Sequence, residues 1–169
     1  MIRWLMLLAL PVAAADVPLG AHATIHAQGN GRPAPTFQHF KNGVKVGDGA
    51  QYVIQSATTG DAGTYIIHGT NGHGSAVSTP IVVVVLVPPS VTRDLTTVMA
   101  NKKGSATFTT AATGTAVRYR WYKNNKLIPG EVGPVLRITS IKPPDAGTYR
   151  VVAYNSVGED FSEARLIVI

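Results

Sequence analysis

The chain has 169 residues, of which 45% are hydrophobic and 14% are charged, and this balance excludes intrinsic disorder as its default state. Its formal net charge is +6, and its 17 glycines and 11 prolines, without any long helical pattern, are typical of many short strands joined by turns. Cysteine is absent, which excludes disulfides, thiol chemistry and cysteine-based zinc sites.

The first fifteen residues are predicted to form a secretory signal peptide. Arg3 supplies a positive start, residues 4–12 are apolar, and the three alanines at 13–15 form a small-residue cleavage site. The alternatives are a buried strand or a membrane anchor, but the apolar run is far shorter than the ~20 residues that span a bilayer. We therefore expect an exported chain, periplasmic, secreted or at the cell surface, with no membrane span after signal removal.

A repeated pentapeptide then sets the organisation of the chain. Asp-Ala-Gly-Thr-Tyr occurs at residues 61–65 and again at 145–149, and the surrounding apolar, Asn and Gly positions match at the same offset. A fixed period indicates that one structural unit is used twice, and a repeat of this length suits a small all-β domain. We expect consecutive domains at residues 16–87 and 88–169.

The first repeat has little room for a leading strand, because only residues 16–19 precede its first alternating segment. Its last predicted strand is a run of seven apolar residues that would then have an unpaired edge: Ile81, Val82, Val83, Val84, Val85, Leu86 and Val87. We hypothesise that a strand of a partner or of a second copy adds to this edge. The alternatives are burial of the run against the second domain, or cover from an uncleaved N-terminus.

The second repeat has room for a leading strand between residues 88 and 103. Ala106, Phe108 and Thr110 alternate with other residues, as a half-buried strand requires. Further strands are expected at 119–121, at 136–138, after the Pro-Pro-Asp corner at 143–145, and at 164–169.

These motifs resemble the immunoglobulin-like domains of the intermediate set. Asp-x-Gly-x-Tyr, with Asn six and Gly nine residues after the tyrosine, resembles that family's E–F corner and F–G turn, and Trp121 resembles its C-strand tryptophan. Gly31-x-Pro33-x-Pro35 resembles its B–C loop. The resemblance covers nearly all of residues 17–169. It implies an all-β fold of two Greek-key β-sandwiches, in which Tyr65 and Tyr149 hydrogen-bond to upstream backbone.

The chain departs from this family at the disulfide. The family's cysteines are replaced by Ala27 and Ile67 in the first domain and by Thr110 and Val151 in the second. Loss of such a cross-link typically costs about 2–5 kcal/mol, so the core must hold each domain together. We expect that core to include Tyr65, Ile67, Trp121, Tyr149 and Val151. Since His39 stands where the second domain has tryptophan, the first domain is predicted to be the weaker.

The lack of cysteine and of Asn-x-Ser/Thr sequons favours a bacterial source for an exported chain.

Charge is distributed unevenly between the two predicted domains: residues 16–87 hold three basic and three acidic residues, whereas residues 88–169 hold eleven basic and six acidic residues. An acidic partner would therefore meet the second domain.

Strand alternation gathers a candidate binding face on that second domain. If Tyr119, Trp121, Tyr149 and Val151 point inward, five residues must point outward on neighbouring strands: Arg118, Arg120, Tyr122, Arg150 and Tyr154. Arginine and tyrosine are enriched in binding hot spots, and this face could grip an acidic protein or an anionic glycan. The alternative is a solvated face held by cross-strand packing.

Catalytic and metal-binding patterns are not found in the sequence. The five histidines lack the spacing of a ligand motif, no serine lies in a Gly-x-Ser-x-Gly elbow, and no phosphate-binding loop occurs. We expect no enzyme activity and no cofactor, and no nucleic-acid partner, because the chain has no basic run. The sequence favours an exported binding or adhesion protein; the alternative is a structural spacer within a larger cell-envelope assembly.

Overall fold

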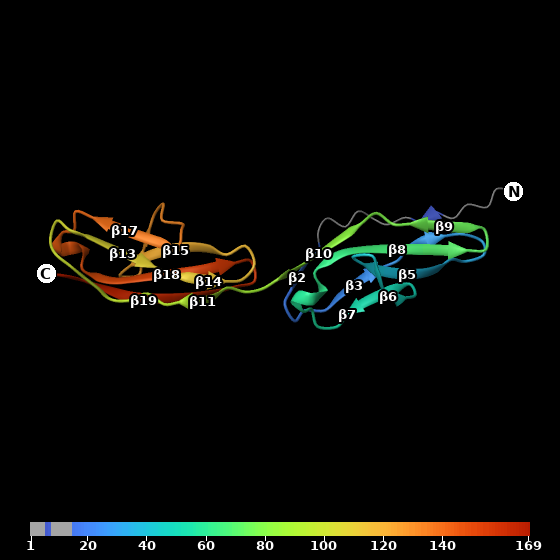
Figure 1. The fold of residues 1–169 in the computed structure, drawn as a ribbon, viewed down its shortest axis with the longest axis horizontal. Coiled ribbons are helices and arrows are strands. Elements are labelled where there is room, and N and C mark those ends of the chain that lie inside the picture. The colour runs from blue at the N-terminus through green and yellow to red at the C-terminus, as the bar shows by residue number, and fades with distance from the viewer. Residues whose placement is uncertain (1–5, 8–14) are drawn as a thin grey trace. The chain divides into compact units, whose positions relative to one another are not determined.

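The computed structural model describes residues 6–7 and 15–169 and consists almost entirely of β-strands (Figure 1). By its contacts the chain separates into two compact units, with the boundary between Leu86 and Val87. Of the predicted signal peptide, only Met6–Leu7 and Ala15 belong to the described residues, and the rest lies outside them.

Among the described residues, the first unit has one large sheet and two small sheets of two strands each. The larger sheet has the order β2-β10-β8-β5-β6, with β9 also paired to β8, while β3 pairs with β7 and β1 with β4. The elements are β1 (Met6–Leu7), β2 (Ala15–Pro18), β3 (Ala23–His26), β4 (Gly29–Asn30), β5 (Thr36–Lys41), β6 (Val44–Asp48), β7 (Gln51–Ile54), the 3₁₀ turn η1 (Thr59–Asp61), β8 (Gly63–Asn71), β9 (Gly74–Val77) and β10 (Ile81–Leu86).

The second unit repeats this topology. Its larger sheet has the order β12-β19-β18-β15-β16, and its other pairs are β13 with β17 and β11 with β14. The elements are β11 (Ser90–Arg93), β12 (Val98–Ala100), β13 (Ser105–Thr109), β14 (Ala111–Thr113), β15 (Arg118–Lys123), β16 (Lys126–Ile128), β17 (Val135–Thr139), the 3₁₀ turn η2 (Pro143–Asp145), β18 (Gly147–Asn155) and β19 (Gly158–Val168). The corresponding strand order confirms the predicted fold class, two immunoglobulin-like β-sandwiches.

Each unit has its own hydrophobic core between its sheets. Tyr65 and Ile67 lie in the first core, and Trp121, Tyr149 and Val151 lie in the second; all five side chains are buried. In the second core the Phe108 ring lies 5.1 Å from the Tyr149 ring and 6.5 Å from the Trp121 ring, measured between centroids. Such aromatic contacts add to the stabilisation that burial itself provides.

The repeated pentapeptide forms the same corner in both units. The Tyr65 hydroxyl donates a hydrogen bond to the Asp61 carbonyl oxygen at 2.9 Å, and the Tyr149 hydroxyl donates to the Asp145 carbonyl oxygen at 2.9 Å. The 3₁₀ turns η1 and η2 each end at the aspartate of this motif. This is the upstream backbone contact that the family resemblance implies for both tyrosines.

Apolar side chains and a threonine stand at the positions of the family's cysteines. Ile67 and Val151 are buried, and Ala27 is partly buried. Thr110 is also buried, and its hydroxyl donates to the Arg93 carbonyl oxygen at 2.9 Å, so the polar replacement is satisfied. Packing, rather than a covalent bond, therefore joins the two sheets of each unit.

The prediction of an open edge along residues 81–87 is wrong. β10 is paired on both sides, antiparallel to β8 and parallel to β2, and the register of the parallel pair runs from Val83 opposite Ala15 to Leu86 opposite Pro18. β2 covers this edge from Val83 to Leu86, and the Val17 side chain of β2 is buried in the core. The valine run also alternates, with Ile81, Val83 and Val85 buried.

Both units have two leading strands. In the second unit β11 pairs with β14, and β12 runs parallel to β19. In the first unit β1, which lies within the predicted signal peptide, pairs with β4, and β2 runs parallel to β10. The expected lack of a leading strand in the first unit is therefore wrong, because β2 lies beside β10.

Candidate binding face

Two adjacent strands of the second unit bring the predicted face together. In the antiparallel register of β15 and β18, Arg118 lies opposite Tyr154, Arg120 opposite Val152 and Tyr122 opposite Arg150. Residues directly opposite each other on antiparallel strands share one side of the sheet. The five predicted residues therefore lie on one side, opposite the side that carries Trp121 and Val151 into the core.

A third strand, β19, adds residues to this face that are not among the five predicted from the sequence. Phe161 lies opposite Val152, Glu163 opposite Arg150 and Glu159 opposite Tyr154. We call the outward side of β15, β18 and β19 the arginine face. Its charges are mixed, because the acidic side chains of β19 stand among the arginines.

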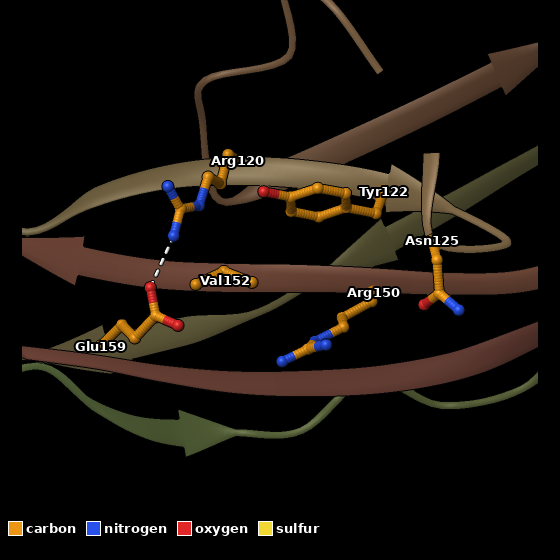
Figure 2. A pocket seen from close by; sticks show the side chains of 6 residues that line it. All are labelled: Arg120, Tyr122, Asn125, Arg150, Val152 and Glu159. Atoms are coloured by element: carbon orange, nitrogen blue, oxygen red, sulfur yellow. Dashed lines mark hydrogen bonds and ion pairs between the residues drawn. The ribbon is translucent and has the colours of Figure 1, made fainter. Parts of the chain in front are cut away.

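A cavity of about 340 Å³ is hollowed into the arginine face, as Figure 2 shows. Arg120 and Tyr122 reach it from β15, and Glu159 and Arg150 lie on the other side of Val152. The lining residues are Arg120, Tyr122, Asn125, Arg150, Val152 and Glu159.

Val152 forms the apolar floor of this cavity. It points outward by strand alternation, yet its side chain is only 3% exposed, because the neighbouring side chains cover it. The Arg150 guanidinium carbon lies 3.9 Å from the centroid of the Phe161 ring, and the Arg120 guanidinium carbon lies 4.6 Å from that of Tyr154. These cation–π contacts hold both cationic groups against the sheet.

The two arginines differ in their charge partners. The Arg120 Nη2 atom lies 2.5 Å from the Glu159 Oε2 atom in a partly exposed ion pair (dashed line in Figure 2). Within residues 15–169, no carboxylate forms an ion pair with Arg150. The stacking on Phe161 is therefore its main contact.

Both arginines keep an unused hydrogen-bond donor. The Nε atoms of Arg120 and of Arg150 are buried and have no hydrogen-bond partner among the described residues. A buried donor without a partner costs about 1–3 kcal/mol and calls for an explanation. Both unused donors belong to residues that line the same cavity.

This chemistry suits the binding of an anion. Guanidinium groups donate charge-assisted hydrogen bonds to carboxylates and phosphates, whereas the cavity lining contains neither a histidine nor a hydroxyl nucleophile of the serine or threonine type. Within the part of the chain that the structure describes, no group of three or more His, Cys, Asp or Glu side chains could hold a metal ion. The same part contains no helix that is both long and apolar enough to cross a bilayer.

Sequence reasoning missed half of the cavity lining. Glu159 is not among the predicted residues because the last strand is expected at residues 164–169, whereas β19 begins at Gly158. In the structure the exposed and buried residues of β19 alternate from Phe161 to Leu166, but the sequence does not display this period, because Phe161 is exposed and Ser162 is buried. Strand alternation also places Val152 on the outward side, but its burial there depends on tertiary contacts that alternation does not give.

Comparison with known proteins finds a family model that is similar to the second unit. Residues 88–155 match the family model described as "Immunoglobulin domain". Roundabout homolog 1 of Mus musculus is 29% identical over 167 residues, covering 90% of this chain and 10% of that protein. Cell adhesion molecule Dscam1 of Drosophila melanogaster is 31% identical over 149 residues, covering 80% of this chain and 7% of that protein. The chain thus spans a tenth or less of these relatives.

Among solved structures, an I-band fragment of titin has the same fold. It superposes with a TM-score of 0.81 at 21% identity, covering 99% of this chain and 66% of the fragment. At this identity the likeness concerns the fold alone.

The relatives named above are animal proteins, so they give no support to the bacterial source that the missing cysteines and sequons favoured.

Proposed function

We propose that the chain is a non-catalytic, exported binding or adhesion protein whose second unit contacts a protein or an anionic glycan through the arginine face. The observation that carries this proposal is the cavity lined by the guanidinium-bearing side chains of Arg120 and Arg150. Arginine and tyrosine at the centre of a face are the residue types that dominate binding energy at interfaces.

The charge of the second unit supports an anionic partner. Residues 88–169 hold eleven basic and six acidic residues, a difference of +5, while residues 16–87 hold three of each. Such a charge steers anionic molecules toward the second unit and raises their association rate at low salt. One relative is a cell adhesion molecule by name, which agrees with a role in binding.

The test compares two triple variants of the same charge change. In the first, Arg118→Gln, Arg120→Gln and Arg150→Gln remove the cations of the arginine face. In the control, Arg93→Gln, Arg137→Gln and Lys142→Gln remove three exposed cations outside it. Binding is measured by surface plasmon resonance to a panel of acidic proteins and of sulfated and carboxylated glycans.

We expect the first variant to lose at least about tenfold in affinity for the partner found, since truncated hot spots cost upwards of about 1–2 kcal/mol each. The control variant should keep most of the affinity. A partner that binds the first variant as well as the original chain would contradict the proposal, as would a panel without any binder. The spacer role would then be favoured, because it needs no ligand at this face.

A further inference from the structure

Resting on the proposed function, we infer that the cavity of the arginine face takes one carboxylate side chain, an aspartate or glutamate of a partner protein. Arg120 and Arg150 line the cavity on either side of the Val152 floor. A carboxylate offers two oxygen atoms, and each can accept a charge-assisted hydrogen bond. One anion between the two guanidinium groups would therefore give Arg150 a charged partner and would compete with Glu159 for Arg120.

Glu159 already shows what the cavity accepts. Its carboxylate contacts Arg120 at 2.5 Å, while the side chains of Arg120 and Glu159 remain 38% and 55% exposed. Ion pairs of such exposure contribute little stability, so exchanging Glu159 for another carboxylate costs little. Glu159 thus acts as an internal competitor that occupies one of the two arginines until a partner displaces it.

The mixed charge of the face favours a single carboxylate over a sulfated glycan. Glu163 lies opposite Arg150, and Glu159 lies opposite Tyr154, so acidic groups interrupt any track of cations. A polyanionic chain would meet both carboxylates and be repelled, whereas one side chain entering the cavity meets Arg120 and Arg150 and only the Glu159 carboxylate. The apolar floor formed by Val152 also suits the methylene groups of an amino-acid side chain.

The test follows the two arginines directly by nuclear magnetic resonance. The ¹⁵N-labelled full chain is titrated with N-acetylglutamate amide, which presents one carboxylate on a capped backbone, and with N-acetylglutamine amide as the neutral control. A heparin tetrasaccharide forms the glycan arm. The Nε–Hε cross-peaks of Arg120 and Arg150, assigned by single substitutions to glutamine, report contact in the cavity.

Variants sharpen the readout. Glu159→Gln keeps both arginines and removes the competitor, so affinity for the glutamate probe should rise about two- to fivefold. Arg150→Gln should lower that affinity about tenfold or more, the loss expected for a charged hydrogen bond. Arg165→Gln is the matched control, because Arg165 lies opposite Thr148 on the same face but outside the cavity lining, and it should leave affinity nearly unchanged.

The possible results separate this inference from the proposed function. Saturable shifts of both cross-peaks with the glutamate probe, strengthened by Glu159→Gln, support it. Shifts with the tetrasaccharide alone overturn the carboxylate site and leave a binding function intact. No shift with either probe overturns the site, and the panel described above then decides whether the face binds anything. Weaker binding after Glu159→Gln also overturns the inference, even if Arg150→Gln does not fold.

Discussion

The two units share their corners and differ at their centres. In both, a tyrosine hydroxyl donates to a corner carbonyl, and an asparagine side chain, Asn42 or Asn124, accepts from the backbone N–H of Thr64 or Thr148 at 2.9 Å. These corners form alike although the cores beneath them are different. The conformation of the corner is therefore set by its own hydrogen bonds rather than by the side chains of the core.

The centres differ in apolar content. Trp121 is fully buried, and its Nε1 donates to the Gly133 carbonyl oxygen at 2.8 Å, so its one polar atom is satisfied. His39 is equally buried and contacts the Gly49 carbonyl oxygen at 3.0 Å through Nε2, but its Nδ1 has no partner among the described residues. The first core therefore buries a smaller ring and contains an unsatisfied nitrogen, which costs free energy of folding. We predict that the first unit is the less stable of the two.

The largest expected effect tests this difference. Trp121→Ala should destabilise the second unit by about 3–5 kcal/mol, because it removes a large buried side chain and leaves a cavity. His39→Ala should destabilise the first unit by less, since it removes a smaller ring and an unsatisfied atom together. Hydrogen exchange followed by mass spectrometry reads the two units separately within one chain. Equal losses would show that the two centres are energetically alike.

A second prediction concerns the leading strands. Compared with a chain that begins at Ala15, a chain that begins at Leu19 lacks β2, loses the burial of Val17, worth about 1.5–3 kcal/mol, and uncovers the edge of β10. We expect this chain to associate with rising concentration, as light scattering would measure, while a chain that begins at Ala15 stays monomeric. A truncated chain that remains monomeric throughout would mean that the edge is protected in another way.

Alkaline pH should lower the stability of both units alike, because each unit has a corner with the same tyrosine hydrogen bond. Burial raises the pKa of Tyr65 and of Tyr149 from 10.0 to about 12. Stability that depends on the protonated phenols is fully present below pH 10 and is lost as the pH rises through about 12. Denaturant unfolding at stepped pH should show this loss. Tyr65→Phe and Tyr149→Phe should each cost about 1 kcal/mol at neutral pH and remove the alkaline dependence of their own unit.

The smallest expected effect is a loss of stability of the first unit at acidic pH, through Asp61 in its η1 corner. Hydrogen bonds from the Thr58 hydroxyl and then from its backbone N–H hold the pKa of Asp61 below its usual 3.8. The stability that this carboxylate contributes is present above pH 3.8 and is lost as the pH falls through the lower folded pKa. Hydrogen exchange of the first unit between pH 5 and 2.5 checks this prediction. Asp61→Asn should flatten the profile, and an unchanged profile would exclude Asp61 as its source.

Local patterns in the sequence were sufficient to predict most of the fold. The pentapeptide located both corners, and alternation around Trp121 and Tyr149 placed the five residues of the face on one side of the sheet. These features depend on neighbours in the chain or on a period of two, which a sequence displays directly. The repeat also showed that the two units share one topology.

Long-range and rotameric features were not predictable in the same way. The parallel pairing of β2 with β10 joins segments nearly 70 residues apart, and four residues carry no period that reveals it. The unused Nε donors of Arg120 and Arg150 depend on how each side chain lies over an aromatic ring. Strand alternation gives the side of a sheet, but it does not give the direction of a guanidinium group.

The parallel pairing of β2 with β10, and of β12 with β19, has a mechanical consequence. In each pair a leading strand and a closing strand run in the same direction, so a pull on the two ends of a unit slides the strands past each other. Their backbone hydrogen bonds then carry the load together rather than opening one at a time. Without a cross-link between the sheets, a unit that yields can lengthen over its whole chain, by at most about 3.3–3.6 Å per residue.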